Sequence, residues 1–291
     1  MNKIKIAFIS SLVVIASGYY NYTNIAFAES TKSNLVQSLS EGSQLDWSKN
    51  VIKVTGSGAP PDKGNMAQKR NMAVRAAKLD AYRQLLEIVN GVHVSSETIV
   101  KDFVTESDII KTKVEGLLKG FEQVGEARYM SDGSVEVDVQ IKLFGKGSVA
   151  SIIMPEEIKK IENDTIPNTK IQPQEIKEEY TGLIIDCKGL GAKPAMSPAI
   201  FDSDNGQLYI GNQEIDPDYV INEGIVSYAD SIPDAKKIDR AGKNPLIIKA
   251  SNALGNFKSD IIIKNDDAKK VLGANKITNI LSKFKVVMVI D

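Results

Sequence analysis

Residues 65–92 of the chain are NMAQKRNMAVRAAKLDAYRQLLEIVNGV, and their spacing predicts one long amphipathic helix that runs into a strand. Apolar side chains recur at steps of three and four along it and are expected to form one buried stripe. The stripe consists of Met72, Ala76, Leu79, Tyr82, Leu86 and Val89. The charged residues that lie off the stripe are Arg75, Lys78, Arg83 and Glu87. A helix with such a stripe needs a sheet to cover it.

The sequence on both sides of this helix supplies strands for that sheet. The clearest one follows Asp132-Gly133, a dipeptide typical of tight hairpins, which would join it to a strand at residues 124–129. Its alternating apolar residues are Val135, Val137, Val139, Ile141 and Leu143. Residues 51–55 and 92–100 have the β-branched content of two further strands.

A second helix is predicted between the strand at 92–100 and the hairpin. Either Thr105 or Ser107 can cap it, and Gly120 ends it. Its buried stripe would consist of Ile110, Val114, Leu117 and Leu118. Asp62 or Asn65 can cap the long helix in the same way. The order strand, helix, strand, helix, hairpin predicts an α+β domain, an antiparallel sheet with helices packed on one face.

The rest of the chain indicates a second α+β domain. Residues 146–179 contain a short helix and then a polar, proline-containing linker. Residues 180–291 are rich in strand patterns and should form an antiparallel or mixed sheet with helices on one face. Asn265 can cap a helix in this part, and the apolar run at residues 284–291 predicts a central strand buried on both faces.

The N-terminus has the pattern of an export signal. Residues 1–28 combine a basic start, an apolar run too short to span a bilayer comfortably and a small-x-small end at Ala28, so cleavage is expected before Glu29. An uncleaved membrane anchor is the alternative. No cysteine lies near this point to carry a lipid. Residues 29–46 are polar and predict a flexible arm ahead of the first domain at residues 47–145.

Composition narrows the functional classes. With 42% hydrophobic and 25% charged residues, the 291-residue chain is typical of globular proteins, and two domains are expected. The 36 basic and 37 acidic residues leave no positive excess for a nucleic-acid interface. Cys187 is the single cysteine and cannot form an intramolecular disulfide. It lies in an apolar run, so an inert buried thiol is favoured over a reactive one.

Three motifs that suggest ligand chemistry fail on inspection. The glycine loop at residues 56–61 places Pro61 at the third glycine of a dinucleotide motif and Lys63 at the second glycine of a phosphate-binding motif. His93 is the single histidine and lacks the partners that a zinc site or a triad requires. The acidic loop at residues 202–206 has its glycine one position too early for a calcium loop. No catalytic, cofactor-binding or metal-binding residue is therefore predicted, and the chain is not expected to be an enzyme.

Residues 47–145 carry a recognisable combination of motifs. Trp47, the sequence IKVTGSGAPP, the helix RAAKLDAYRQLLEIVNGV and the later VGEARYMSDGSVEVDVQI resemble the family of lipoprotein-twenty surface antigens. The same pattern is similar to the N-terminal domain of flagellar assembly protein T. The resemblance implies an α+β domain of the Gram-negative envelope without enzymatic activity. Many relatives are lipoproteins, whereas this chain lacks a lipidation cysteine.

The expected function is that of an exported, non-catalytic envelope protein with a structural, assembly or protein-binding role. The resemblance places it in the periplasm or at the outer membrane, with other envelope proteins as partners, and flagellar basal-body assembly is its most concrete version. Membrane association would be peripheral at most. The alternative is a periplasmic binding module for a small molecule or glycan, with a pocket between the domains. Exposed sheet edges also leave room for a homo-oligomer.

Overall fold

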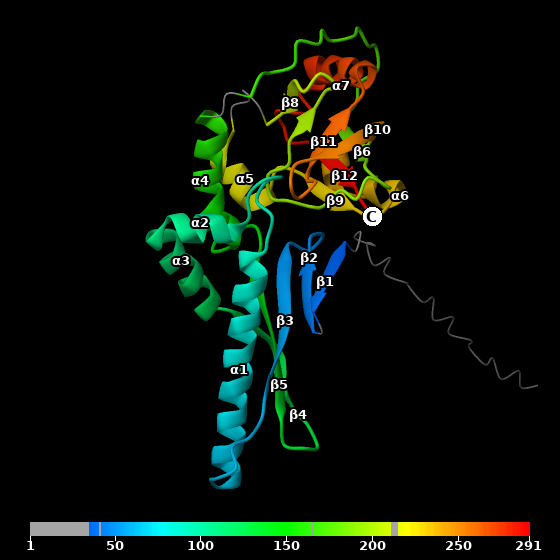
Figure 1. Cartoon of the computed structure of the whole chain (residues 1–291). Helices are drawn as coiled ribbons and strands as arrows, with labels where there is room; N and C mark the ends of the chain where they lie inside the picture. Colours follow the sequence, from blue (N-terminus) through cyan, green and yellow to red (C-terminus); the bar gives the residue numbers. More distant parts are fainter. Residues whose placement is uncertain (1–34, 41, 164–165, 211–214) are drawn as a thin grey trace, which may run out of the picture. The chain divides into compact units, whose positions relative to one another are not determined.

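The computed structural model describes residues 35–40, 42–163, 166–210 and 215–291. These residues form an α+β fold with a five-stranded antiparallel sheet and a seven-stranded mixed sheet, which confirms the predicted fold class (Figure 1). The predicted cleavage site at Ala28 and Glu29 lies outside the described residues.

The first sheet has the strand order β1-β2-β3-β5-β4. Its strands are β1 (Val36–Ser40), β2 (Ser43–Asp46), β3 (Val51–Gly58), β4 (Glu122–Tyr129) and β5 (Val135–Lys142). The β4–β5 hairpin forms where Asp132-Gly133 predicts it, with Tyr129 opposite Val135. Along β5 the apolar side chains are buried and their neighbours are half-buried or exposed, so the predicted alternation is confirmed.

Residues 36–40 and 43–46 correct the prediction of a flexible arm for the described part of residues 29–46. They form β1 and β2, and β2 continues the sheet by pairing with β3 from Ser43 opposite Val54 to Asp46 opposite Val51. Polar residues obscured these strands in the sequence. In β2 the buried residues are Ser43, Leu45 and Asp46, and only Leu45 is apolar, so the strand has no alternating apolar pattern.

The long helix α1 (Met66–Asn90) begins at the predicted cap Asn65. The Asn65 side chain accepts from the Gln68 backbone N–H at 2.9 Å, and the Gln68 side chain accepts from the Asn65 backbone N–H at 3.0 Å. This reciprocal pair satisfies two of the amide groups that a helix start leaves free. The helix stops at Gly91 and does not run on into a strand.

The predicted buried stripe of α1 is wrong over most of its length. The side chains that are buried are Ala73, Ala77, Ala81, Leu85, Ile88 and Val89. Met72 and Leu79, two members of the predicted stripe, are 50% and 51% exposed. Only Val89 of the predicted set is fully buried, and Tyr82 and Leu86 are partly buried.

Two glycines of β3 explain which face of α1 is buried. A Cβ atom on Gly56 would lie 2.2 Å from the Ala77 carbonyl oxygen, and one on Gly58 would lie 2.3 Å from the Ala73 carbonyl oxygen. Strand and helix backbones therefore touch, which only small residues on both sides allow. The alanine row, and not the row of larger side chains, is the one that fits against this strand.

Residues 92–99 correct the prediction of a strand after Gly91. They contain a single isolated bridge, between His93 and Ile99, and lead directly into α2 (Val100–Glu106). The next helix, α3 (Asp108–Lys119), has the predicted cap Ser107 and ends before Gly120 as expected. The segment turns back on itself, because the Val94 N–H donates to the Thr98 carbonyl at 2.9 Å and the Val100 N–H to the Val92 carbonyl at 3.0 Å. Its other backbone groups bond to residues far along the chain, described below.

The segment between the two sheets starts with α4 (Val149–Asn163), which is longer than the short helix predicted there. The following linker residues are bonded to the C-terminal part of the chain. The Thr169 N–H donates to the Gln207 carbonyl at 3.0 Å, and the Gln174 N–H donates to the Lys269 carbonyl at 3.0 Å. Gly273 allows the second contact, since a Cβ there would lie 2.3 Å from the Gln174 carbonyl oxygen.

The second sheet has the strand order β8-β7-β11-β10-β6-β12-β9. Its strands are β6 (Gly182–Asp186), β7 (Ile200–Phe201), β8 (Gln207–Tyr209), β9 (Ser227–Ala229), β10 (Pro245–Leu254), β11 (Asp260–Ile263) and β12 (Val286–Val289). β12 pairs in parallel with β6 on one side and β9 on the other, and its four residues are buried. The prediction of a doubly buried strand near the end of the chain is confirmed.

The helical elements of this part are short apart from the last. They are α5 (Pro217–Glu223), α6 (Ile232–Ala235), the 3-10 turn η1 (Asp239–Ala241) and α7 (Asn265–Thr278). The predicted cap of α7 is corrected by one residue, because Lys264 occupies the cap position. The Asn265 side chain instead accepts from the Ser203 N–H at 2.9 Å and donates to Asp204 at 2.9 Å.

Arg240 of η1 ties several of these elements together. Its guanidinium group is buried, with the residue 7% exposed. Nη1 donates to the carbonyls of Ile225 (3.1 Å) and Phe284 (2.6 Å), and Nη2 donates to those of Glu223 (2.7 Å) and Gly224 (3.2 Å). One side chain thus connects the segment before β9 (residues 223–225) to the segment before β12 (Phe284).

Candidate functional site

The residues that the sequence singled out for chemistry have structural roles. Asp202 accepts hydrogen bonds from the N–H groups of Asp204 (2.8 Å) and Gly206 (2.7 Å) and from the Thr169 hydroxyl, so its carboxylate shapes the β7–β8 hairpin. Cys187 is buried, and this raises the pKa of its thiol to about 12. Such a thiol stays protonated and unreactive at neutral pH. Within the described residues, no group of three or more His, Cys, Asp and Glu could hold a metal ion.

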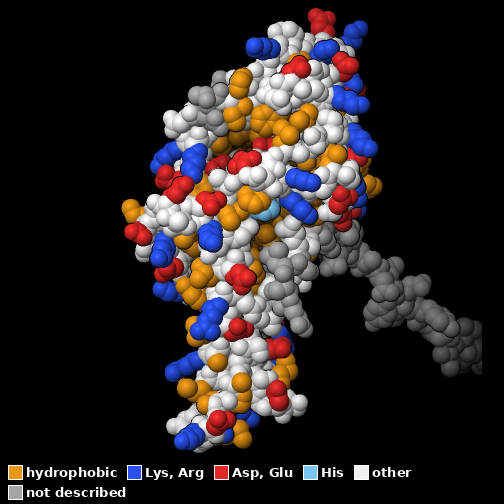
Figure 2. Space-filling model, viewed as in Figure 1, with side chains coloured by type: hydrophobic (Ala, Val, Ile, Leu, Met, Phe, Trp, Pro, Cys, Tyr) orange, Lys and Arg blue, Asp and Glu red, His pale blue; other side chains and the backbone are white. Residues whose placement is uncertain are grey.

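The outer side of α1 is the first candidate interaction surface. We call it the α1 face and define it by residues that share the side of the helix away from β3: Lys69, Met72, Arg75, Ala76, Leu79 and Arg83. Apart from the half-buried Lys69, all of these residues are exposed. Figure 2 shows basic and hydrophobic side chains next to one another along α1. The face is about 21 Å long at 1.5 Å per helical residue.

The positive charges of this face are not used inside the molecule. Among the described residues, Lys69, Arg75 and Arg83 have no carboxylate within ion-pair distance, whereas many lysines elsewhere are paired, such as Lys159 with Glu156 at 2.9 Å. Arginine and methionine, which this face carries, are enriched where proteins bind one another.

The segment 93–97 is the second feature of interest, because it is bonded to the C-terminal part of the chain. The N–H groups of Met196 and Ser197 donate to the carbonyls of His93 (3.0 Å) and Val94 (2.7 Å). The Ser96 hydroxyl donates to Asp260 Oδ2 at 2.6 Å, and burial raises the pKa of that carboxyl. These bonds fix residues 93–97 against the loop that follows β6.

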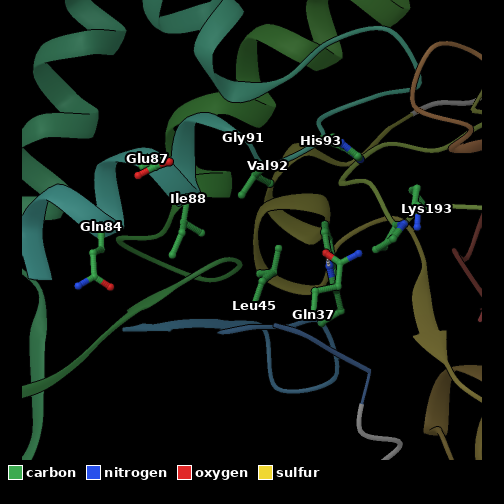
Figure 3. A pocket seen from close by; sticks show the side chains of 11 residues that line it. Gln37, Leu45, Gln84, Glu87, Ile88, Gly91, Val92, His93 and Lys193 are labelled. Carbon is green, nitrogen blue, oxygen red and sulfur yellow. Dashed lines mark hydrogen bonds between the residues drawn. The ribbon is translucent and has the colours of Figure 1, made fainter. Parts of the chain in front are cut away.

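A pocket of about 580 Å³ opens beside this segment (Figure 3). We call it the junction pocket. Its lining residues are Gln37, Leu45, Trp47, Gln84, Glu87, Ile88, Gly91, Val92, His93, Lys193 and Pro194. In Figure 3, Leu45 rises from the strand side and Ile88 and Val92 descend from the helix side around the same space, while Lys193 lies at the opposite end from Glu87. The volume falls in the range of about 300–1,000 Å³ that is usual for small-molecule sites.

His93 lies at the edge of the junction pocket. Its ring stacks on Phe257 with centroids 4.4 Å apart and an angle of 20° between the planes. Burial lowers the pKa of His93, the charge of Lys193 lowers it further, and a hydrogen bond to the Pro194 backbone opposes both. The imidazole is therefore neutral at pH 7 and partly buried.

The lowered pKa of His93 predicts a loss of stability in weak acid. The unfolded chain, with a histidine pKa of about 6.5, takes up the proton more readily than the folded chain. The contribution of neutral His93 to the free energy of unfolding is therefore complete above pH 6.5. It is lost as the pH falls through the pKa of His93 in the folded chain. Urea unfolding between pH 7.5 and 5.5 should show this loss in the native chain and a smaller one in His93→Gln. A sample without a histidine tag gives one imidazole NMR signal, which reports the titration of His93. A titration midpoint at or above pH 6.5 in the folded chain would contradict the prediction.

The sequence did not reveal the junction pocket. Gln37 and Lys193 lie more than 150 positions apart and carry no motif, and residues 29–46 were expected to be outside the fold. The α1 face was missed because Met72 and Leu79 were assigned to the core. The sequence also placed Arg75 and Arg83 off the stripe of Met72 and Leu79, whereas the structure has all four on one exposed side of α1.

Comparison with known proteins covers the C-terminal part of the chain. Residues 182–291 match the family model of the second domain of Treponema pallidum Tp0624. The matched region begins at β6 and spans less than half of this chain. No curated protein shows a significant similarity to the chain. The described residues include no helix that is long and apolar enough to cross a membrane.

Proposed function

We propose that this protein is an exported, non-catalytic component of the cell envelope that docks onto a partner protein through the α1 face. The observation that supports it is the combination of the exposed Met72 and Leu79 with the unpaired Arg75 and Arg83 on one side of a helix. Methionine and arginine are enriched at protein interfaces. The opposite side of α1 is fixed on β3, so the face is presented on a rigid support.

The charge of the face indicates an acidic partner surface. Arginine binds carboxylates through two parallel hydrogen bonds, which gives both energy and orientation. A membrane surface fits less well, because an interfacial helix buries a continuous apolar face, whereas Met72 and Leu79 are separated by Ala76 and Arg75. Envelope location and a link to flagellar basal-body assembly extend the resemblance of residues 47–145 and belong to the same proposal.

Reversing the charge of the α1 face should abolish docking. A photoreactive amino acid placed at Leu79 of the full chain, in its native cell, is expected to give a discrete cross-linked protein. Arg75→Glu with Arg83→Glu should reduce that product by about tenfold, since like charges would then face each other. The experiment also reports export, because the cross-linked chain should be processed after Ala28.

The matched control carries the same change in net charge on another helix. Lys111 and Lys113 of α3 are exposed and have no ion pair within the described part of the chain, so Lys111→Glu with Lys113→Glu should leave the product unchanged. Loss of the cross-linked product in both double variants would indicate a general effect of net charge and would contradict the assignment of the docking surface to α1. If the photoreactive group at Leu79 labels only lipid, the α1 face binds a membrane and not a protein, and the proposal is wrong.

A further inference from the structure

The junction pocket has one positively charged corner, formed by Lys193 beside the neutral imidazole of His93. Lys193 and His93 both line it, and the two side chains are close enough for the lysine charge to act on the imidazole. Lys193 is exposed and forms no ion pair with any described residue. The groups that face His93 are the Phe257 ring, the Pro194 backbone and the Lys193 ammonium, and none of these is acidic.

The remainder of the pocket is mainly apolar. Its apolar residues are Leu45, Trp47, Ile88, Val92 and Pro194, and Gln37, Gln84 and Gly91 also contribute to the lining. Glu87 is the acidic residue of the lining, and Figure 3 shows it on α1 at the far end from Lys193. The pocket is thus polarised, with an anion-attracting end, an apolar middle and an acidic end that would repel a second negative charge.

We propose that the junction pocket binds a small organic carboxylate with an apolar body, with the carboxylate at Lys193 and His93 and the body against Leu45, Ile88 and Val92. A charge-assisted hydrogen bond from the ammonium group fixes the head of the ligand. Burial of the apolar body supplies most of the binding energy. This site is separate from the α1 face and does not depend on the docking role.

Two other ligand classes fit the pocket less well. Sugars bind on an exposed aromatic ring, but Trp47 is buried, packs edge-on against Tyr228 at 5.5 Å and already donates its indole N–H to Gln37 at 3.2 Å. An organic cation in the corner that Lys193 lines would be repelled by the ammonium group. The charge of this corner therefore favours a carboxylate over a cation.

Three probes of equal chain length test the charge rule. Octanoate, octanol and octylammonium, each below its micelle concentration, are titrated into the full-length protein by calorimetry at pH 7. Octanoate is expected to bind about tenfold more tightly than octanol, and octylammonium more weakly than either. Equal affinity for the three probes, or binding of none, would overturn the proposal.

Lys193 and Lys188 lie on the loop after β6 and provide a variant and its matched control. Lys193→Gln should weaken octanoate binding about tenfold and leave octanol unchanged, because only the charged contact is lost. Lys188, exposed on the same loop but outside the pocket lining, is the control, and Lys188→Gln should bind octanoate as the native chain does. Equal losses in both variants would show a general charge effect and contradict the assignment.

The imidazole of His93 gives an independent readout. A carboxylate beside the ring favours its charged form, so octanoate should raise the midpoint of the single histidine NMR signal and octanol should not. A midpoint that does not move while octanoate binds would place the ligand elsewhere and overturn the proposed site.

Discussion

Replacing Arg240 with methionine is expected to lower the free energy of unfolding by about 4 kcal/mol, because hydrogen bonds to a charged group contribute about 1.5–3 kcal/mol each and add incompletely. The guanidinium group donates to the carbonyls of Glu223, Gly224, Ile225 and Phe284. Methionine fills much of the space but removes the donors of these carbonyls, of which Ile225 keeps the Tyr209 hydroxyl at 2.6 Å. Urea unfolding followed by far-UV circular dichroism measures the effect.

Two further variants test the cause. Arg240→Lys keeps the charge but presents a compact ammonium that cannot reach carbonyls on both sides, so about half of the loss should remain. Lys243→Met, an exposed position three residues away, should change the free energy of unfolding by less than about 0.5 kcal/mol. A loss below about 1 kcal/mol for Arg240→Met would mean that water replaces the guanidinium group and that these bonds contribute little.

The second large effect is expected at Gly58. An alanine Cβ there would lie 2.3 Å from the Ala73 carbonyl oxygen and 2.4 Å from the Ala77 amide nitrogen. Both are backbone atoms, so relief requires α1 or β3 to move as a whole. Overpacking of this kind costs about 3 kcal/mol. Thermal unfolding of Gly58→Ala should show the loss as a lower midpoint.

Gly116 is the matched control for this substitution. It lies in α3, and a Cβ there would meet no atom within 4 Å. Gly116→Ala should therefore raise the free energy of unfolding by up to about 1 kcal/mol through helix propensity. If Gly58→Ala proved as harmless as Gly116→Ala, the close packing of α1 on β3 would be refuted.

The local signals in the sequence identified most elements of the fold. Caps at Asn65 and Ser107, the Asp132-Gly133 hairpin and the alternation in β5 depend on interactions within a few residues, and all four are confirmed. Each of these signals is a short-range preference that agrees with the final fold.

The errors arose where a distant segment decided the outcome. The apolar row of α1 with the larger side chains looked like the core face, but two glycines of β3 require the alanine row. The strand predicted at residues 92–100 is lost because Met196 and Ser197 bond its carbonyls. Periodicity within one helix or strand carries no information about such partners.

The two candidate sites differ in how far the sequence could lead to them. The sequence indicated that Arg75 and Arg83 of the α1 face are exposed, but it missed the exposure of Met72 and Leu79 and their shared side with the two arginines. The junction pocket joins side chains from β1, the end of α1 and the loop after β6. No spacing rule connects these segments, so only their arrangement in three dimensions brings Lys193 beside His93.

The position of β12 has a consequence for the order of folding. β12 follows every other strand in the sequence, yet it lies between β6 and β9 and holds them apart. Until it is present, β6 lacks a neighbour on one side and β9 has none, so both expose unpaired backbone groups. The second sheet therefore cannot close before β12 has been synthesised. Until then the unpaired edges of β6 and β9 remain open to chaperones.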